Sequence, residues 1–271
     1  MLIDREAIMY PVLHLGSITV STYTFMALVI FVLTYLIGLK LLPRTGLNRR
    51  FLTYAWLIII PLALLGARAF YILQYPRYFL NNPLYIFNFR QGGYSAYGAL
   101  LLTNILGFLV MWRKKVDFGD TWLIADALVP SLIVGHILWR VLCCFLAGCC
   151  YGKPAYGFPL AVTFNHPLTA CAYRGIPVHP TQLYEAFGVF IILIIIMRLR
   201  ERATFKGQLC WTYFLLYGVV RFIVEFFRGD VRPMITPNFS IHQALSLLLI
   251  IASLIIMHRW KERYPIHKTP Q

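Results

Sequence analysis

Seven long apolar runs alternate with short polar segments along the chain. They cover roughly Ile18–Leu42, Leu52–Leu73, Ala96–Trp112, Trp122–Leu146, Gln182–Met197, Gln208–Phe227 and Ile241–Met257. Each run is close to the roughly 20 residues that a helix needs to cross the hydrocarbon of a bilayer, although the third and the fifth are short. A closed barrel would show short alternating segments instead. The pattern predicts an all-α polytopic membrane protein of about seven transmembrane helices.

Basic residues are concentrated in every second loop. One set of loops holds Arg44, Arg49, Arg50, Arg113, Lys114, Lys115, Arg198, Arg200, Arg202, Lys206, Arg259, Lys261, Arg263 and Lys268. The opposite set has fewer, spread over longer segments: Arg5, Arg77, Arg90, Lys153, Arg174 and Arg232. The positive-inside rule then puts the N-terminus outside and the C-terminus in the cytoplasm of a bacterial-type cytoplasmic membrane.

Composition supports a membrane protein and argues against a nucleic-acid-binding one. Hydrophobic residues make up 59% of the 271 residues and charged residues 13%, so lipid must cover most of the apolar surface. The net charge of +15 lies mainly in the short loops, which suits anionic headgroups. The N-terminal ten residues show no cleavable signal pattern, so we expect the first helix to act as an uncleaved insertion signal.

Two segments on the predicted outer side have the composition of structured segments and not of simple connecting loops. One is rich in aromatic residues and ends in a Gly-Gly pair, and the other is rich in Pro, Gly and Tyr. We expect one transmembrane domain over residues 1–271, with an outer-surface arm at residues 75–95 and an outer-surface head segment at residues 149–180. Both would form small elements on the periplasmic side.

Ionisable side chains inside apolar runs are costly, so each one is a hypothesis for a functional site. They are Arg68, Asp126, Arg140, Glu185, Arg221 and Glu225, with Arg228 at the outer end of its run. Arg221 and Glu225 are spaced four residues apart and form either a self-neutralising pair or the lining of a polar cavity that binds an anionic headgroup. Arg228 lies on the same face, and two arginines exceed what one glutamate neutralises, which favours the anion site.

Four polar features keep a structural and a functional interpretation open. Arg68 stands between small residues, which suits close helix packing as well as a site. Asp126 lies near the cytoplasmic end of its helix, and we favour the structural interpretation that it satisfies a helix terminus. The Gly92–Gly98 segment is either a turn that opens a helix or a cradle for a phosphate. His179 and the following Pro-Thr-Gln predict the start of a helix, with His179 a base, a cap or a surface residue.

The cysteines near the end of the fourth run fit no common metal or redox spacing. They form two pairs, Cys143-Cys144 and Cys149-Cys150. If the helix continues, Cys143 and Cys150 are neighbours on one face. If Cys149, Cys150 and Cys171 lie outside, a disulfide among them is compatible with that oxidising space. We therefore keep a thiol redox or metal-binding membrane protein as one hypothesis for the function.

Five ordered segments carry the motifs of one known family. They are Tyr23 with Met26 (Y-x-x-M), Gly66–Tyr71 (G-x-R-x-x-Y), Pro83-Leu84 with Gly92–Leu100 (P-L…GG-x-S-x-[HY]-GG-L), His179–Glu185 (H-P-[ST]-Q-L-Y-E) and Tyr217–Arg228 (Y-G-x-x-R-x-x-x-E-x-x-R). On these motifs the chain resembles the prolipoprotein diacylglyceryl transferases almost from end to end.

The fourth run departs from the family's usual G-R-x-x-N-F-x-N-G-E-x-x-G signature. Arg140 fits it when one residue is inserted before Phe145. Both Asn positions are changed, to Cys144 and Ala147, and the Glu position is Cys149. This cysteine-rich form resembles a divergent branch of the family.

The resemblance implies a transfer of diacylglyceryl from phosphatidylglycerol to the lipobox cysteine thiol of a prolipoprotein signal peptide, with release of glycerol-1-phosphate. The leaving phosphate needs a cation, and the acceptor thiol must lose its proton. The implied catalytic residues are Arg140, Arg221, Glu225, Tyr97 and Tyr23. The implied substrate-binding residues are Arg68, Gly92, Gly93, Ser95, Gly98, Gly152, His179, Gln182, Tyr184, Glu185 and Arg228.

The proton acceptor stays open at this point. Tyr97 occupies the position where many family members carry a histidine, and a tyrosine, with an ordinary pKa of about 10, is a poor base. His179, Glu185 and Glu225 are the other choices. We expect no cofactor and no metal, partners limited to phosphatidylglycerol, the prolipoprotein signal peptide and the bilayer, and little effect of Cys149→Ser. The alternatives are a transferase with another acceptor and a lipid-binding or lipid-moving protein without chemistry.

Overall fold

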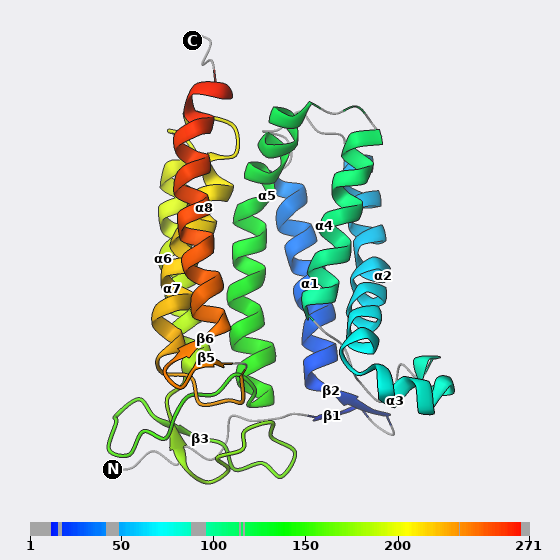
Figure 1. Ribbon diagram of the computed structural model, residues 1–271, viewed down its shortest axis with the longest axis vertical. Coiled ribbons are helices and arrows are strands. Elements are labelled where there is room, and N and C mark those ends of the chain that lie inside the picture. Colours follow the sequence, from blue (N-terminus) through cyan, green and yellow to red (C-terminus); the bar gives the residue numbers. More distant parts are fainter. Residues whose placement is uncertain are drawn as a thin grey trace. The chain divides into compact units, whose positions relative to one another are not determined.

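The computed structural model describes residues 12–15, 18–41, 49–87, 96–113, 115, 117–232 and 234–266. The chain divides into two compact units. The first consists of Met1–Leu41 and Trp122–Gln271, and the second of Leu42–Thr121. Figure 1 shows the helices that make up each unit.

The first unit is built from long apolar helices. They are α1 (Thr22–Leu41), most of α5 (Phe118–Leu138), a π-helical continuation η3 (Trp139–Phe145), α6 (Thr181–Leu199), α7 (Gln208–Glu225) and α8 (Ile241–Arg263). α7 packs against both α6 and α8, while η3 packs against α1 and α6. Among the described residues, a core of Ile133, Val189, Ile192 and Ile196 is fully or almost fully buried between these helices.

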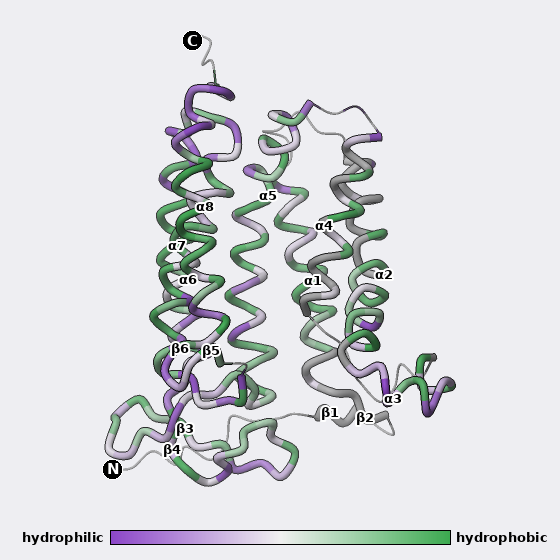
Figure 2. Tube along the Cα trace, in the orientation of Figure 1, coloured by the Kyte–Doolittle hydropathy of each residue, from purple (hydrophilic) through white to green (hydrophobic). Residues whose placement is uncertain are grey.

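Hydrophobic residues predominate along these helices (Figure 2), and many of their large apolar side chains are exposed. Phe187 is 66% exposed and Leu248 is 63% exposed, which water would not favour. Among the described residues, three helical segments are long and apolar enough to cross a membrane: Phe118–Phe145, Thr181–Leu199 and Ile241–Arg263. The prediction of an all-α membrane protein is confirmed, and the number of crossings stays a prediction.

All seven predicted apolar runs coincide with helices, but the first one begins later than expected. A helix from Ile18 is wrong, because β2 (Ile18–Ser21) pairs antiparallel with β1 (Val12–Leu15) and α1 begins only at Thr22. The β-branched residues of Ile18–Ser21 suit a strand, and a strand partner six residues upstream decides between two structures that a short apolar run permits.

Two further pairs of short strands lie in the first unit. β3 (Val162–Thr163) pairs with β4 (Pro177–Val178), and β5 (Met234–Thr236) pairs with β6 (Phe239–Ser240). The predicted start of a helix after His179 is confirmed, since α6 begins at Thr181 directly after Pro180. The segment between η3 and α6 contains the β3–β4 pair and bonds to the chain after α7 through Gly152 and Arg228.

The second unit is a helix pair with a short arm. α2 (Arg49–Gln74) packs against α4 (Ala96–Arg113), and α3 (Pro76–Asn81) and η2 (Pro83–Phe87) follow α2. Gly66 and Gly98 face each other across the pair, where a Cβ on either would collide with the carbonyl oxygen of the other. Glycine at both positions is thus required for the close approach of the two helices.

Candidate active site

Glu185 of α6 lies at the centre of a buried polar cluster. Its Oε1 lies 2.6 Å from Nη2 of Arg140 and accepts a 2.9 Å hydrogen bond from the Tyr217 hydroxyl. His136, one turn before Arg140, brings Nε2 to 3.4 Å from the same oxygen, and its Nδ1 lies 2.9 Å from the hydroxyl of Tyr213. We call these five residues the Glu185 cluster. The Glu185 side chain is fully buried, so its charge needs these partners.

A second carboxylate gathers cations at the end of α7. Glu225 Oε2 lies 2.6 Å from Nη1 of Arg221, and Oε1 lies 2.5 Å from Nη1 of Arg232. The Ser240 hydroxyl donates a 2.7 Å hydrogen bond to Oε1, and His242 Nδ1 lies 3.7 Å from it. We call Arg221, Glu225, Arg232, Ser240 and His242 the Glu225 cluster. The i, i+4 spacing of Arg221 and Glu225 thus does produce an ion pair, with a second arginine added.

The structure shows an excess of positive charge near Glu225, but from a different arginine than the sequence suggested. Arg228 does not compete for Glu225, because Asp230 accepts two hydrogen bonds from it, of 2.7 and 2.6 Å. The excess comes instead from Arg232, which the sequence suggested was only a loop residue. With Arg140 and Arg221, this region has four arginines and three carboxylates. One uncompensated positive charge suits a singly charged anion.

The two clusters belong to one electrostatic region of the first unit. Arg221 interacts with the charge of Glu185 as well as with Glu225. Arg140 likewise acts on Arg228. A ligand bound near either cluster therefore experiences the field of both.

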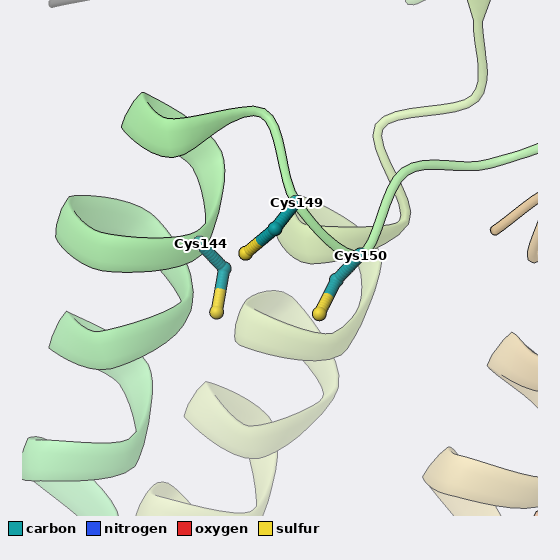
Figure 3. Close-up of side chains that lie close together, drawn as sticks. All are labelled: Cys144, Cys149 and Cys150. Carbon is teal, nitrogen blue, oxygen red and sulfur yellow. The ribbon is translucent and has the colours of Figure 1, made fainter. Parts of the chain in front are cut away.

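Three thiols border this region where the chain leaves η3. The sulfur atoms of Cys144, Cys149 and Cys150 all lie within 4.8 Å of one another and point toward a common space (Figure 3). We call them the three-thiol cluster. Nη1 of Arg140 lies 3.9 Å from Sγ of Cys144, so this cluster adjoins the Glu185 cluster.

Side chains of α6 hold in place the loop at residues 149–152, which we call the cysteine loop. The Thr181 hydroxyl donates a 2.6 Å hydrogen bond to the carbonyl of Cys150, and the Gln182 amide donates one of the same length to the carbonyl of Cys149. Cys150 has φ of 62°, a left-handed conformation that costs a non-glycine residue roughly 1–2 kcal/mol. Hydrogen bonds from Cys144 and Cys149, with Arg228 and Arg140 adding to them, lower the pKa of the Cys150 thiol.

The helix does not continue to Cys150, so the condition under which Cys143 and Cys150 would be neighbours on one face is not met. Gly148 has φ of 67° and turns the chain out of the helix before Cys150, so the two cysteines do not share a helical face. All six cysteines are free thiols. Cys171 packs in an apolar cluster with Phe145 and Phe164, and burial raises the pKa of its thiol. The disulfide considered from the sequence is therefore not present.

Comparison with known proteins identifies the family. A family profile described as prolipoprotein diacylglyceryl transferase matches residues 11–259. The chain belongs to this family. A protein of Bacillus cytotoxicus is 31% identical over 94% of this chain and 91% of its own length. Proteins of Bacillus cereus (32% identity, 79% of this chain and 78% of that one) and Finegoldia magna (29%, 86% and 88%) are similarly related. All three are named phosphatidylglycerol–prolipoprotein diacylglyceryl transferase.

The family motif around His179 supports the cysteine loop. His179 Nδ1 lies 3.0 Å from the Tyr184 hydroxyl. Gly152 donates its backbone N–H to the carbonyl of His179, and a Cβ at Gly152 would collide with that carbonyl. The Gln182 side-chain amide donates its hydrogen bond to the carbonyl of Cys149 in the same loop. The motif thus brings residues 149–152 against the start of α6.

Other residues predicted for this transferase family lie in the second unit or outside the described side chains. The Arg68 guanidinium donates hydrogen bonds to the carbonyls of Ile86 and Tyr85 and lies 5.3 Å above the ring of Phe79, so it holds the arm. Gly98 serves the packing of α2 and α4. Gly92, Gly93 and Ser95 lie outside the described residues, as do the side chains of Tyr23 and Tyr97, which lie on α1 and α4.

Asp126 has the structural role expected of it. It accepts hydrogen bonds of 2.7 and 2.8 Å from the backbone N–H groups of Gly207 and Cys210, at the N-terminus of α7. The prediction that it satisfies a helix terminus is confirmed, although the terminus belongs to another helix. Such a position suits a carboxylate because unpaired N–H groups and the positive end of the helix dipole meet there.

Several residues of the site were not singled out from the sequence. They are His136, Tyr213, Tyr217, Asp230, Arg232, Ser240 and His242. A periodic signal was present for three of them, because Tyr213, Tyr217, Arg221 and Glu225 repeat every four residues and His136 precedes Arg140 by four. Polar residues at helical spacing inside an apolar run mark one face. Asp230 and Arg232 follow α7 in a loop, where spacing carries no such signal, and Ser240 and His242 lie in β6 and at the start of α8.

Proposed function

We propose that this protein is a phosphatidylglycerol–prolipoprotein diacylglyceryl transferase. It moves diacylglyceryl from phosphatidylglycerol to the lipobox cysteine thiol of a prolipoprotein signal peptide, forms a thioether and releases glycerol-1-phosphate. The observation that carries the proposal is the uncompensated positive charge around Arg140 and Arg221 in a membrane protein of this family. The relatives' names indicate the reaction, and the partly buried arginines provide the positive charge that its leaving phosphate needs.

The reaction is a substitution at carbon in which a phosphodiester oxygen departs. Negative charge grows on the leaving phosphate, and buried arginines stabilise such charge more strongly than water does. We assign the phosphate to Arg140 and Arg221. Glu185 and Glu225 would hold these guanidinium groups in position, since each carboxylate contacts its arginine at 2.6 Å. Catalytic roles for Tyr23 and Tyr97 remain part of the proposal by family resemblance.

Substrate binding is proposed for the remaining predicted positions. His179, Tyr184 and Gly152 adjoin the cysteine loop, where a signal peptide would be received. Arg228 adds positive charge beside Cys150. The other proposed contacts are Arg68, Gly92, Gly93, Ser95, Gly98, Gln182 and Glu185.

We place the protein in the bacterial cytoplasmic membrane. The proposed topology has seven crossings within one transmembrane domain, the N-terminus outside and the C-terminus in the cytoplasm. The arm at residues 75–95 and the head segment at residues 149–180 would then lie on the outer surface. The distribution of lysine and arginine among the loops supports this orientation.

Mass spectrometry of a lipobox peptide tests the proposal directly. Purified protein is incubated with the peptide and phosphatidylglycerol vesicles. We expect the peptide to gain the mass of diacylglyceryl, together with release of glycerol-1-phosphate. A matched peptide with serine in place of the lipobox cysteine should gain nothing. A folded preparation that neither modifies the peptide nor consumes phosphatidylglycerol would contradict the proposal and favour a protein that binds or moves lipid.

A second candidate function is a related transferase with a different acceptor. The observation in its favour is the replacement of the family's usual Asn and Glu by Cys144 and Cys149 in the fourth predicted span. Consumption of phosphatidylglycerol without modification of the lipobox peptide would support it. Efficient modification of the peptide alone would remove it.

A further inference from the structure

The three-thiol cluster is organised beyond what packing needs. Cys144 is buried, while Cys149 and Cys150 are only partly buried, so one side of the cluster is accessible. Cys150 is held in a left-handed conformation, and hydrogen bonds from Thr181 and Gln182 fix the carbonyls of both loop cysteines. A strained residue that its surroundings hold firmly is typical of a functional site.

Three converging sulfur atoms fit a thiophilic metal ion. Zinc binds thiolates at about 2.3 Å in a tetrahedron, which separates the sulfur atoms by about 3.8 Å. The upper limit of 4.8 Å between these sulfur atoms requires a contraction of about one ångström or less. Structural zinc sites have four protein ligands, whereas catalytic sites have three and leave one position for substrate. Cys144, Cys149 and Cys150 provide three.

We propose that Cys144, Cys149 and Cys150 bind a zinc ion whose fourth ligand is the thiol of the acceptor cysteine. The identity of that acceptor rests on the function proposed above. The site adjoins the arginine assigned to the phosphate, because Nη1 of Arg140 lies 3.9 Å from Sγ of Cys144. Nucleophile and leaving group would therefore meet in one place.

A zinc ion at this site would explain how the acceptor thiol loses its proton. Glu185 and Glu225 are both engaged by arginines, and His179 contacts Tyr184. A metal ion removes the need for a base, since a coordinated thiol is deprotonated outright. Three thiolates and one zinc ion have a net charge of −1, which the nearby Arg140 and Arg228 stabilise.

The chemical step balances without an oxidant or a reductant. The acceptor thiol releases its proton to solvent when it binds zinc. Its sulfur then uses a lone pair to form the C–S bond with the glycerol carbon of the diacylglyceryl group. The bond from that carbon to the phosphate oxygen breaks, and its electron pair leaves with glycerol-1-phosphate.

Metal content and cobalt spectroscopy test the site independently of turnover. We expect the detergent-purified full-length protein to hold one zinc ion per chain, and Cys149→Ser or Cys150→Ser to lose it. Cys143→Ala is the matched control, since Cys143 neighbours Cys144 but is not part of the cluster, and it should retain the zinc ion. In the cobalt-substituted protein, the lipobox peptide should strengthen the sulfur-to-cobalt absorption band, and the serine peptide should leave it unchanged.

The outcomes separate this inference from the proposed function. The zinc site would be refuted if the purified protein held no zinc, held copper instead, or formed a disulfide between cluster cysteines. It would also be refuted if the lipobox peptide left the cobalt absorption band unchanged. If the peptide is nevertheless lipidated, the transferase stands and the metal does not. Zinc and the peptide-dependent band without lipidation would support the site and contradict the transferase. With this site, the earlier expectation for Cys149→Ser reverses, and transfer should fall at least 100-fold.

Discussion

Two buried carboxylates in the first unit differ in what neutralises them. Asp126 accepts from backbone N–H groups of Gly207 and Cys210, at the N-terminus of α7. Glu185 instead faces the side chains of Arg140, His136 and Tyr217. Both groups would be costly to bury alone, yet backbone groups neutralise Asp126 whereas ionisable side chains surround Glu185.

The surroundings of the two carboxylates agree with this difference. Near Asp126, the rings of Trp122, Trp211 and Trp260 pack with centroids 4.9 to 5.6 Å apart and form an aromatic cluster. Near Glu185 lie the cysteine loop and the second arginine-rich cluster. We therefore assign Asp126 a structural role and place Glu185 in the proposed active site.

The largest expected effect is on phosphate binding. Arg221→Ala should lower transfer by at least about 100-fold, since a buried donor to a developing anion typically contributes that much. The measurement is the initial rate of peptide lipidation, with circular dichroism to show that the protein still folds. Arg198→Ala, which removes the same charge from an exposed position at the end of α6, is the control and should keep its rate. Normal turnover in Arg221→Ala would refute the assignment.

Removing the charge of Glu185 should have the next largest effect. Glu185→Gln leaves the Arg140 guanidinium without its counter-charge and lets it shift, so we expect a loss of about 10- to 100-fold in kcat. Kinetics at saturating phosphatidylglycerol measure it. A change confined to thermal stability, with the rate per folded molecule intact, would place Glu185 in the same class as Asp126.

Tyr217 should contribute less. Tyr217→Phe removes one 2.9 Å hydrogen bond to Glu185, and a bond of this kind is worth about 1 kcal/mol, or roughly a fivefold change in rate. The comparison of Tyr217→Phe with the unaltered protein in the same lipidation assay measures this. A loss as large as that of Glu185→Gln would indicate that Tyr217 contacts substrate itself.

Asp126 should affect stability alone. Asp126→Ala removes the cap of α7 and should lower the free energy of unfolding by about 1–2 kcal/mol, while the rate per folded molecule stays unchanged. Asp126→Asn is the matched variant, because its one amide oxygen can accept from one of the two N–H groups while its NH2 group cannot accept from the other, so it should fold and recover part of the stability. A loss of activity in the stable Asn variant would end the distinction between the two carboxylates.

The sequence was a good guide wherever the information is local. Apolar runs gave the helix positions, and His179-Pro180 gave the start of α6. The motif around Arg221 and Glu225 was read correctly as one helical face, and the family followed from the ordered motifs. The one wrong helix start also has a local cause, since Ile18–Ser21 suits a strand as well as a helix.

The sequence by itself therefore determined an all-α membrane protein of the prolipoprotein diacylglyceryl transferase family, with arginines inside its apolar helices as the main candidate site residues. The tertiary structure decided which charges meet. Arg140 and Glu185 are 45 residues apart, and the pairing of Arg228 with Asp230 and of Arg232 with Glu225 follows from how the chain turns after α7. Spacing along a helix fixes neighbours four residues away, whereas contacts between helices depend on packing that no single segment encodes.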